Sequence, residues 1–165
     1  MTITDLNGTE REAFVEAIGW VFEHSPWVAE RAWARRPFSS LDRLHAALVD
    51  SMHAATTDEQ LALLRAHPDL GARMHMSEAS VGEQVSAGLD RLTRSDFERL
   101  QQLNADYRTK FEFPFLFAVK GSTPVQILEA LEERLPRDPQ SEFEEALRQV
   151  ARIARFRLED TISPG

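Results

Sequence analysis

The sequence of 165 residues contains no cysteine. This excludes thiolate nucleophiles, disulfide bonds and zinc sites built on cysteine, and it fits a reducing compartment, so we expect a cytoplasmic location and no redox role. No apolar run approaches the roughly 20 residues that a membrane-spanning helix needs, and the first residues lack the pattern of a signal peptide. We therefore expect no membrane partner.

Basic residues are too few to balance the acidic ones. There are 19 Lys and Arg against 27 Asp and Glu, which gives a formal net charge of -8 and a pI near 5.1. Such a chain repels nucleic acid, which is therefore not an expected partner. The hydrophobic content of 42%, with ten Phe, is enough to build one core. We expect a single domain over residues 1–165.

Apolar residues recur at helical spacing through most of the chain. Two pairs match capping boxes, Thr9 with Glu12 and Thr57 with Gln60. The expected helices cover residues 9–25, 26–36, 41 to beyond 48, 57–67, 80–92 and 95–110, and two more begin at Pro124 and Pro139. Strand signals are sparse, so the predicted fold class is an all-α, single-domain multi-helix bundle.

One segment departs from the helical period. Residues 111–121 read Phe-Glu-Phe-Pro-Phe-Leu-Phe-Ala-Val-Lys-Gly, with phenylalanine at alternate positions, the period of an extended chain. In a helical protein, an extended segment has backbone N–H and C=O groups that need partners outside a helix. The segment is either a buried crossing between helices or the lining of a ligand pocket, and composition does not decide between the two.

His67 lies in the sequence Arg-Ala-His-Pro-Asp-Leu-Gly, where Pro68 ends the preceding helix. Histidine is the side chain most easily poised as an acid or base near neutral pH. A histidine at a helix end is also an ordinary structural residue that bonds to the last carbonyls. The position by itself allows both interpretations.

A second polar cluster reads Ser80-Val81-Gly82-Glu83-Gln84. Ser80 and Glu83 match a capping box, which explains them as the start of a helix. A helix N-terminus also presents unpaired N–H groups and partial positive charge, so the same turn can hold a polar or anionic ligand. The capping box leaves Gln84 unexplained.

Arg157 lies in the apolar stripe of the last helix. At about 100° per residue it falls about 20° from Val150, on the core side. A buried guanidinium needs an acidic partner or an anionic ligand, since isolated buried charge is strongly unfavourable. Arg157 therefore either packs its stem on the core while the guanidinium reaches outward to solvent or meets a structural carboxylate, or it grips a carboxylate or planar amide of a ligand.

Taken in order, four motifs resemble the OHCU decarboxylase family. They are Ala66-His67-Pro68-Asp69-Leu70-Gly71, Ser80-x-x-Glu83-Gln84 with Ala87-Gly88-Leu89, Asn104-x-x-Tyr107-x-x-Lys110-Phe111, and Phe113-Pro114-Phe115 with Ala118-Val119-Lys120-Gly121. Four spaced motifs over nearly the whole chain are far more specific than one. The resemblance implies an all-α, usually homodimeric enzyme without a cofactor, which decarboxylates 2-oxo-4-hydroxy-4-carboxy-5-ureidoimidazoline (OHCU) to (S)-allantoin in urate and purine catabolism.

The same resemblance implies roles for particular residues. His67 would be the catalytic acid or base, with Glu83 and Arg157 completing the polar set. Glu83 would either favour loss of the substrate carboxylate by charge repulsion or orient the substrate hydroxyl group. The implied substrate contacts are Pro68, Ser80, Val81, Gly82, Glu83, Gln84, Phe115, Leu116, Phe117, Ala118 and Val119.

Two other functions stay open on the residues alone. His67-x-Asp69 and His75-x-x-Glu78 have residue types that bind hard metals or zinc in hydrolases. The phenylalanine-rich segment could instead dock a protein partner, in which case its aromatic side chains would matter and His67 would not. Tightly bound metal would support the metal-dependent hydrolase. A substitution of His67 that leaves function intact would support the protein-binding module.

Overall fold

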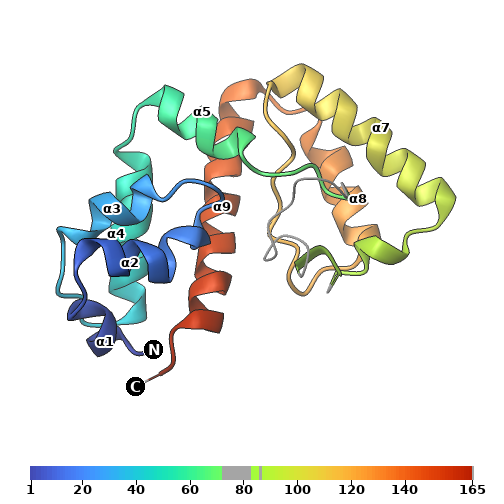
Figure 1. Cartoon of the computed structure of the whole chain (residues 1–165). Helices are drawn as coiled ribbons and strands as arrows, with labels where there is room; N and C mark the ends of the chain where they lie inside the picture. Colours follow the sequence, from blue (N-terminus) through green and yellow to red (C-terminus); the bar gives the residue numbers. More distant parts are fainter. Residues whose placement is uncertain (72–82, 86, 165) are drawn as a thin grey trace. The chain divides into compact units, whose positions relative to one another are not determined.

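The computed structural model describes residues 1–71, 83–85 and 87–164 (Figure 1). All regular structure within these residues is helical, which confirms the predicted all-α class. The α-helices are α1 (Ile3–Asn7), α2 (Arg11–Ile18), α3 (Trp27–Trp33), α4 (Leu41–His53), α5 (Thr57–Arg65), α7 (Arg94–Phe111), α8 (Pro124–Arg134) and α9 (Pro139–Thr161), and the 3-10 helices are η1 (Gly19–Val21) and η2 (Leu89–Arg91). Among the described helices, none is both long and apolar enough to cross a bilayer.

The chain forms two compact units. Unit 1 comprises Met1–Ala66 with Ala151–Gly165, and unit 2 comprises His67–Val150. Helix α9 contributes its first part to unit 2 and its last part to unit 1. The single domain expected over residues 1–165 stays a prediction.

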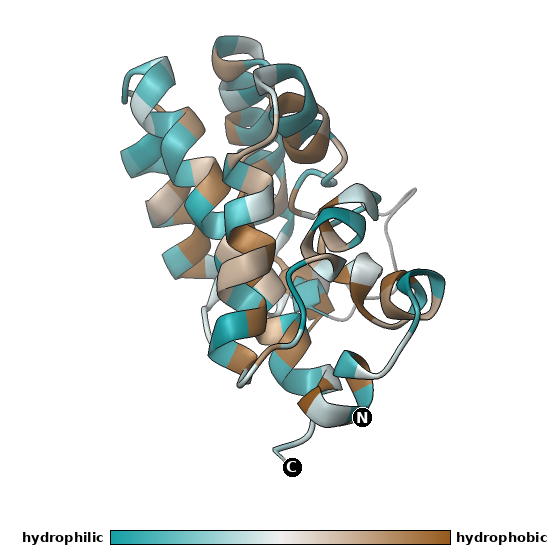
Figure 2. Cartoon of the chain, turned by 90° about the vertical axis from the view of Figure 1, so that its left-hand side faces the viewer, coloured by the Kyte–Doolittle hydropathy of each residue, from teal (hydrophilic) through white to brown (hydrophobic). Residues whose placement is uncertain are grey.

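Unit 1 is built on the amphipathic faces of its helices, which carry hydrophobic and hydrophilic residues on different sides (Figure 2). Phe14 on α2 and Leu44 and Leu48 on α4 are fully buried. The last part of α9 is bonded to α4, where a ring nitrogen of His45 lies 2.8 Å from the carbonyl oxygen of Ala151. These contacts make the C-terminal residues part of the N-terminal core.

The helix predicted for residues 9–25 is wrong at both ends. Glu10, and not Thr9, is the N-cap of α2, and its side chain makes no capping hydrogen bond. The Thr9 hydroxyl donates instead to the Leu6 carbonyl at 2.7 Å, because the residues before it form α1, which the periodicity does not predict. Helix α2 ends at Ile18 and continues as η1.

The helix predicted for residues 26–36 is shorter at both ends, since Pro26 is the N-cap of α3 and the helix ends at Trp33. The boundaries set by the other three prolines are confirmed. Helix α5 ends at Arg65, shortly before Pro68, and α8 and α9 begin at Pro124 and Pro139. The capping box of α5 lies one residue earlier than predicted, since Thr56 and Glu59 form it.

Unit 2 is organised around α7. One face of this helix buries Leu100, Tyr107 and Phe111. The Tyr107 ring lies 4.4 Å from the Phe111 ring and 5.4 Å from the Phe115 ring, measured between centroids. Aromatic packing of this kind adds to the stability that burial provides. It anchors the chain that leaves α7 against the helix itself.

The continuous helix predicted for residues 80–92 is wrong in its described part. Gly88 has φ 80, a left-handed conformation that ends the helical turn at residues 83–85 and leads into η2. The first residues of the predicted helix, 80–82, lie outside the described residues. The glycine supplies a break that hydrophobic spacing does not reveal.

Candidate functional site

His67 lies just past the end of α5, in unit 2, and its side chain is buried, with 5% exposed. Pro68 disfavours the helical conformation at the residue before it, so the helix closes at Arg65 with Ala66 as its cap. The imidazole therefore stands at the beginning of the non-helical loop that runs to Gly71. Its orientation depends on how firmly this loop is held.

Helix α7 holds the His67 loop through two side chains that lie one turn apart. Arg108 Nη2 donates to Asp69 Oδ1 at 3.0 Å. Asn104, whose side chain is buried, donates from Nδ2 to the Leu70 carbonyl at 2.9 Å. A regular helix thus holds the Asp69 side chain and the Leu70 backbone, two and three residues after His67, and rigid elements position functional groups better than loops do.

Gln84 is bonded to the far end of the same loop. Its side chain is buried, and Oε1 accepts a hydrogen bond from the Gly71 N–H at 2.8 Å. Gly71 has φ 82, which favours glycine. The structure therefore brings the predicted contact residue Gln84 to the His67 loop, with the half-buried Glu83 next to it in sequence. The remaining predicted residues of this cluster lie outside the described residues: Ser80, Val81 and Gly82.

The phenylalanine-rich segment starts later than predicted, because α7 includes Phe111. Glu112 then takes φ 64, in the left-handed region, and residues 114–119 form neither helix nor strand. Phe115 and Phe117 stack with their centroids 5.9 Å apart and their planes at 11°, so alternate side chains lie on the same side. The non-helical segment with a period of two is therefore present. Among its predicted contact residues, Phe117 is half-buried. The others are buried, namely Phe115, Leu116, Ala118 and Val119.

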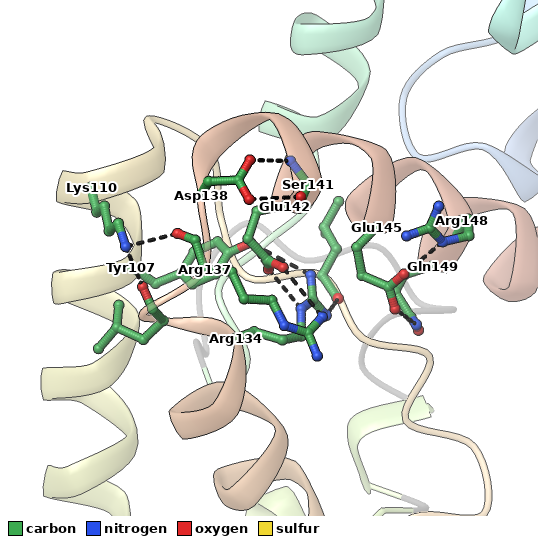
Figure 3. Close-up of polar contacts among 12 residues, drawn as sticks. Tyr107, Lys110, Arg134, Arg137, Asp138, Ser141, Glu142, Glu145, Arg148 and Gln149 are labelled. Atoms are coloured by element: carbon green, nitrogen blue, oxygen red, sulfur yellow. Dashed lines mark hydrogen bonds and ion pairs between the residues drawn. The ribbon is translucent and has the colours of Figure 1, made fainter.

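Two side chains from different helices bond to the backbone of this segment, and both are labelled in Figure 3. Arg134, at the end of α8, donates from Nη1 to the Leu116 carbonyl at 2.6 Å. Gln149, on α9, accepts through Oε1 from the Ala118 N–H at 2.9 Å. Both side chains are buried, so these bonds satisfy backbone groups that water does not reach.

Arg134 belongs to a buried polar network that joins α7, α8 and α9 (Figure 3). Its Nε lies 2.7 Å from Glu142 Oε1, which also accepts from the Tyr107 hydroxyl at 2.6 Å. The guanidinium carbon lies 4.5 Å from the centroid of the Phe115 ring. Burial, together with the hydrogen bond to Glu142, raises the pKa of Tyr107, so its hydroxyl stays protonated and donates.

Arg157 belongs to unit 1, where the structure gives it an acidic partner. Its Nη2 lies 2.9 Å from Glu23 Oε2, and both side chains are buried. Its Nη1 is 3.4 Å from the carbonyl oxygens of Trp20 and Val21. Glu23 is therefore the structural carboxylate that the sequence analysis allowed as a partner of Arg157. The catalytic role of Arg157 stays a prediction.

A profile described as OHCU decarboxylase matches residues 7–159. A protein of Halalkalicoccus jeotgali named 2-oxo-4-hydroxy-4-carboxy-5-ureidoimidazoline decarboxylase is 48% identical over 164 residues, 99% of this chain and 93% of its own length. The chain belongs to the OHCU decarboxylase family. A Mus musculus protein with the same name is 36% identical and is matched over 93% of its length.

Solved structures of similar proteins agree with the OHCU decarboxylase fold. A crystal structure of (S)-allantoin synthase superposes with a TM-score of 0.80 at 32% identity, covering 98% of this chain and 54% of that one. A structure described as OHCU decarboxylase in the presence of (S)-allantoin has a TM-score of 0.71 at 23% identity, which shows a shared fold. Among proteins similar in sequence, a uric acid degradation bifunctional protein of Bacillus subtilis is 44% identical to this chain. The match covers 98% of this chain and 33% of the length of that protein.

Sequence reasoning missed several polar residues that organise this member of the OHCU decarboxylase family. Arg134, Glu142 and Gln149 lie among the polar positions of amphipathic helices, and helical periodicity does not separate a buried polar residue from an exposed one. Tyr107 stands in one of the family motifs, and that was the only signal for the network. Glu23 follows an apolar pair in a short non-helical stretch, where no pattern predicts burial.

The metal-site alternative gains no support from the described residues. They contain no group of three or more His, Asp or Glu residues placed to hold a metal ion. Asp69, one of the four candidate ligands, is paired with Arg108 instead. His75 and Glu78 lie outside the described residues.

Proposed function

We propose that this protein is a carboxy-lyase that converts OHCU to (S)-allantoin in urate catabolism, with His67 as the general acid or base and with no cofactor. The observation that carries the proposal is family membership along almost the full chain, with 48% identity to a protein that bears the decarboxylase name. The buried His67, in a loop bonded to α7 and to Gln84, supplies a suitable acid–base group.

The chemistry needs no external electron sink. When the bond between C4 and its carboxylate breaks, the electron pair forms a C4=C5 double bond, and the electrons of the C5=N bond move to nitrogen, which takes up a proton. The resulting enol then gains a proton at C5 and loses one from the C4 hydroxyl, which leaves the carbonyl of allantoin. A single histidine can carry out these transfers in turn, and delivery of the C5 proton from one side gives one enantiomer.

The other assignments of the site follow the family resemblance. Glu83 either favours loss of the substrate carboxylate by charge repulsion or orients the hydroxyl group of the substrate. Arg157 acts on a carboxylate or amide group while keeping its bond to Glu23. The substrate contacts come from Pro68, residues 80–84 and the segment from Phe115 to Val119. We also propose a cytoplasmic homodimer, with Trp20, Trp27 and Trp33 as candidates for its interface.

The rate of OHCU decay tests the proposal. The substrate is generated from urate by urate oxidase and hydroxyisourate hydrolase, and its absorbance is followed with and without this protein. We expect decay to accelerate in proportion to protein concentration, and to do so equally after exhaustive treatment with a chelator followed by desalting. Loss of the acceleration with the chelator, and its return with added metal, would contradict the cofactor-free mechanism.

A further inference from the structure

The bonds from Arg134 and Gln149 reach backbone groups two residues apart. The first is made to the C=O of Leu116 and the second to the N–H of Ala118. In an extended chain the N–H and C=O of one residue point to the same edge, and successive residues alternate between the two edges. The stacked rings of Phe115 and Phe117 show that the segment alternates in this way. Both bonds are therefore made to the same edge of the segment. The N–H and C=O groups of Phe117 lie on the opposite edge.

The Phe117 peptide groups form no hydrogen bond with any other residue that the structure describes. Phe117 is half-buried and is flanked on both sides by buried residues. Its N–H and C=O form a donor and acceptor pair on one edge, which is complementary to the adjacent N–H and C=O of a ureide. The residue lies in the middle of the segment proposed to contact the substrate.

Gln149 has a fixed orientation, because Glu145 lies one turn before it on α9. Gln149 Nε2 donates to Glu145 Oε1 at 3.1 Å, and Arg148 Nε donates to the other oxygen of Glu145 at 2.7 Å. Although partial burial works against its charge, the pKa of Glu145 is lowered by the bonds from Arg148 and Gln149. A carboxylate only accepts, so the amide nitrogen of Gln149 must face it and the amide oxygen must face Ala118.

We propose that Gln149, oriented by Glu145, is a positioning residue that holds the Ala118 peptide so that the Phe117 peptide edge faces the ureide groups of the substrate. The inference rests on the proposed function and extends it to residues that do not touch the substrate. It predicts that loosening Gln149 weakens substrate binding and leaves the chemical step nearly unchanged, because the proton transfers belong to His67.

A reciprocal exchange of the two side chains tests this arrangement. In Gln149→Glu two carboxylates face each other at positions 145 and 149, so we expect KM to rise about tenfold, with kcat changed less than about threefold. In the double variant Glu145→Gln with Gln149→Glu, one amide and one carboxylate are again present, and the residue at position 149 still accepts from Ala118. We expect KM to return to within about threefold of the original value.

The matched control is Gln140→Glu on the same helix. Gln140 donates to Glu144 at 3.1 Å with the same spacing as Gln149 and Glu145, but the pair is exposed. We expect this variant to keep its KM. Amide hydrogen exchange over residues 114–119 gives a second readout, which should be faster in Gln149→Glu and normal again in the double variant.

The outcomes separate this inference from the proposed function. An active wild-type protein whose folded Gln149→Glu variant keeps the wild-type KM would overturn the positioning role alone. A folded double variant with KM still raised would also overturn it, and this decides the matter even where the single variant does not fold. A wild-type protein with no activity on OHCU would remove both proposals together.

Discussion

Replacing His67 by Asn is expected to lower kcat/KM for OHCU decarboxylation by about 10²- to 10⁴-fold, the usual contribution of a general acid or base. Asparagine keeps a polar side chain of similar size but does not exchange a proton near neutral pH. Because His67 is buried at the end of α5, the variant must also be checked for stability by thermal unfolding. Steady-state kinetics on OHCU generated in place measures the loss.

The matched control for this variant is His53→Asn. His53 is exposed and ends α4, in unit 1. We expect it to change kcat/KM by less than about twofold, as surface substitutions usually have small effects. A folded His67→Asn variant with kcat/KM within about threefold of wild type would show that His67 is a structural residue of the loop.

Replacing Arg134 by Met is expected to lower the free energy of unfolding by about 3–5 kcal/mol, because it leaves Glu142 buried beside Tyr107 without its main partner. The substitution also removes the bond to the Leu116 carbonyl. Arg137 does not replace the lost charge, since its Nη1 is 3.7 Å from Glu142 Oε2 and 47% of its side chain is exposed to water. Chemical denaturation of the purified variant measures the change.

Two further variants serve as controls for this result. Arg94→Met removes the partner of Glu98 in an exposed ion pair on α7, and we expect it to change the free energy of unfolding by less than about 0.5 kcal/mol. Adding Glu142→Gln to Arg134→Met removes the uncompensated charge and should recover part of the lost stability. An Arg134→Met protein as stable as Arg94→Met would show that the buried network does not contribute to the stability of unit 2.

Local rules in the sequence predict most of the helices. Thr123 before Pro124 and Asp138 before Pro139 begin α8 and α9 because proline is favoured at a first helical position. Pro68 likewise ends α5 before His67. The Thr9 capping box is wrong, since a capping match does not show whether another short helix, here α1, competes for the hydroxyl. Gly88 breaks a helix that the apolar spacing favours.

The candidate site is less accessible to sequence reasoning, because its polar contacts join distant residues. Gln84 and Gly71 are 13 residues apart and Gln149 and Ala118 are 31 apart, and no local pattern pairs them. The resemblance to the family selects His67 and Gln84 as residues of interest, and it is silent on Gln149. For Arg157, burial predicts that a partner is needed, but only the fold identifies that partner as Glu23.

The handedness of the product distinguishes catalysed from spontaneous decarboxylation of OHCU. Circular dichroism is recorded while urate oxidase and hydroxyisourate hydrolase convert urate to OHCU, with this protein present, absent or replaced by His67→Asn. We expect rapid growth of the (S)-allantoin signal at a rate proportional to wild-type protein, and slow formation of racemic product in the other two samples. Slow racemic allantoin in all three samples would contradict the assignment of this chain as an OHCU decarboxylase.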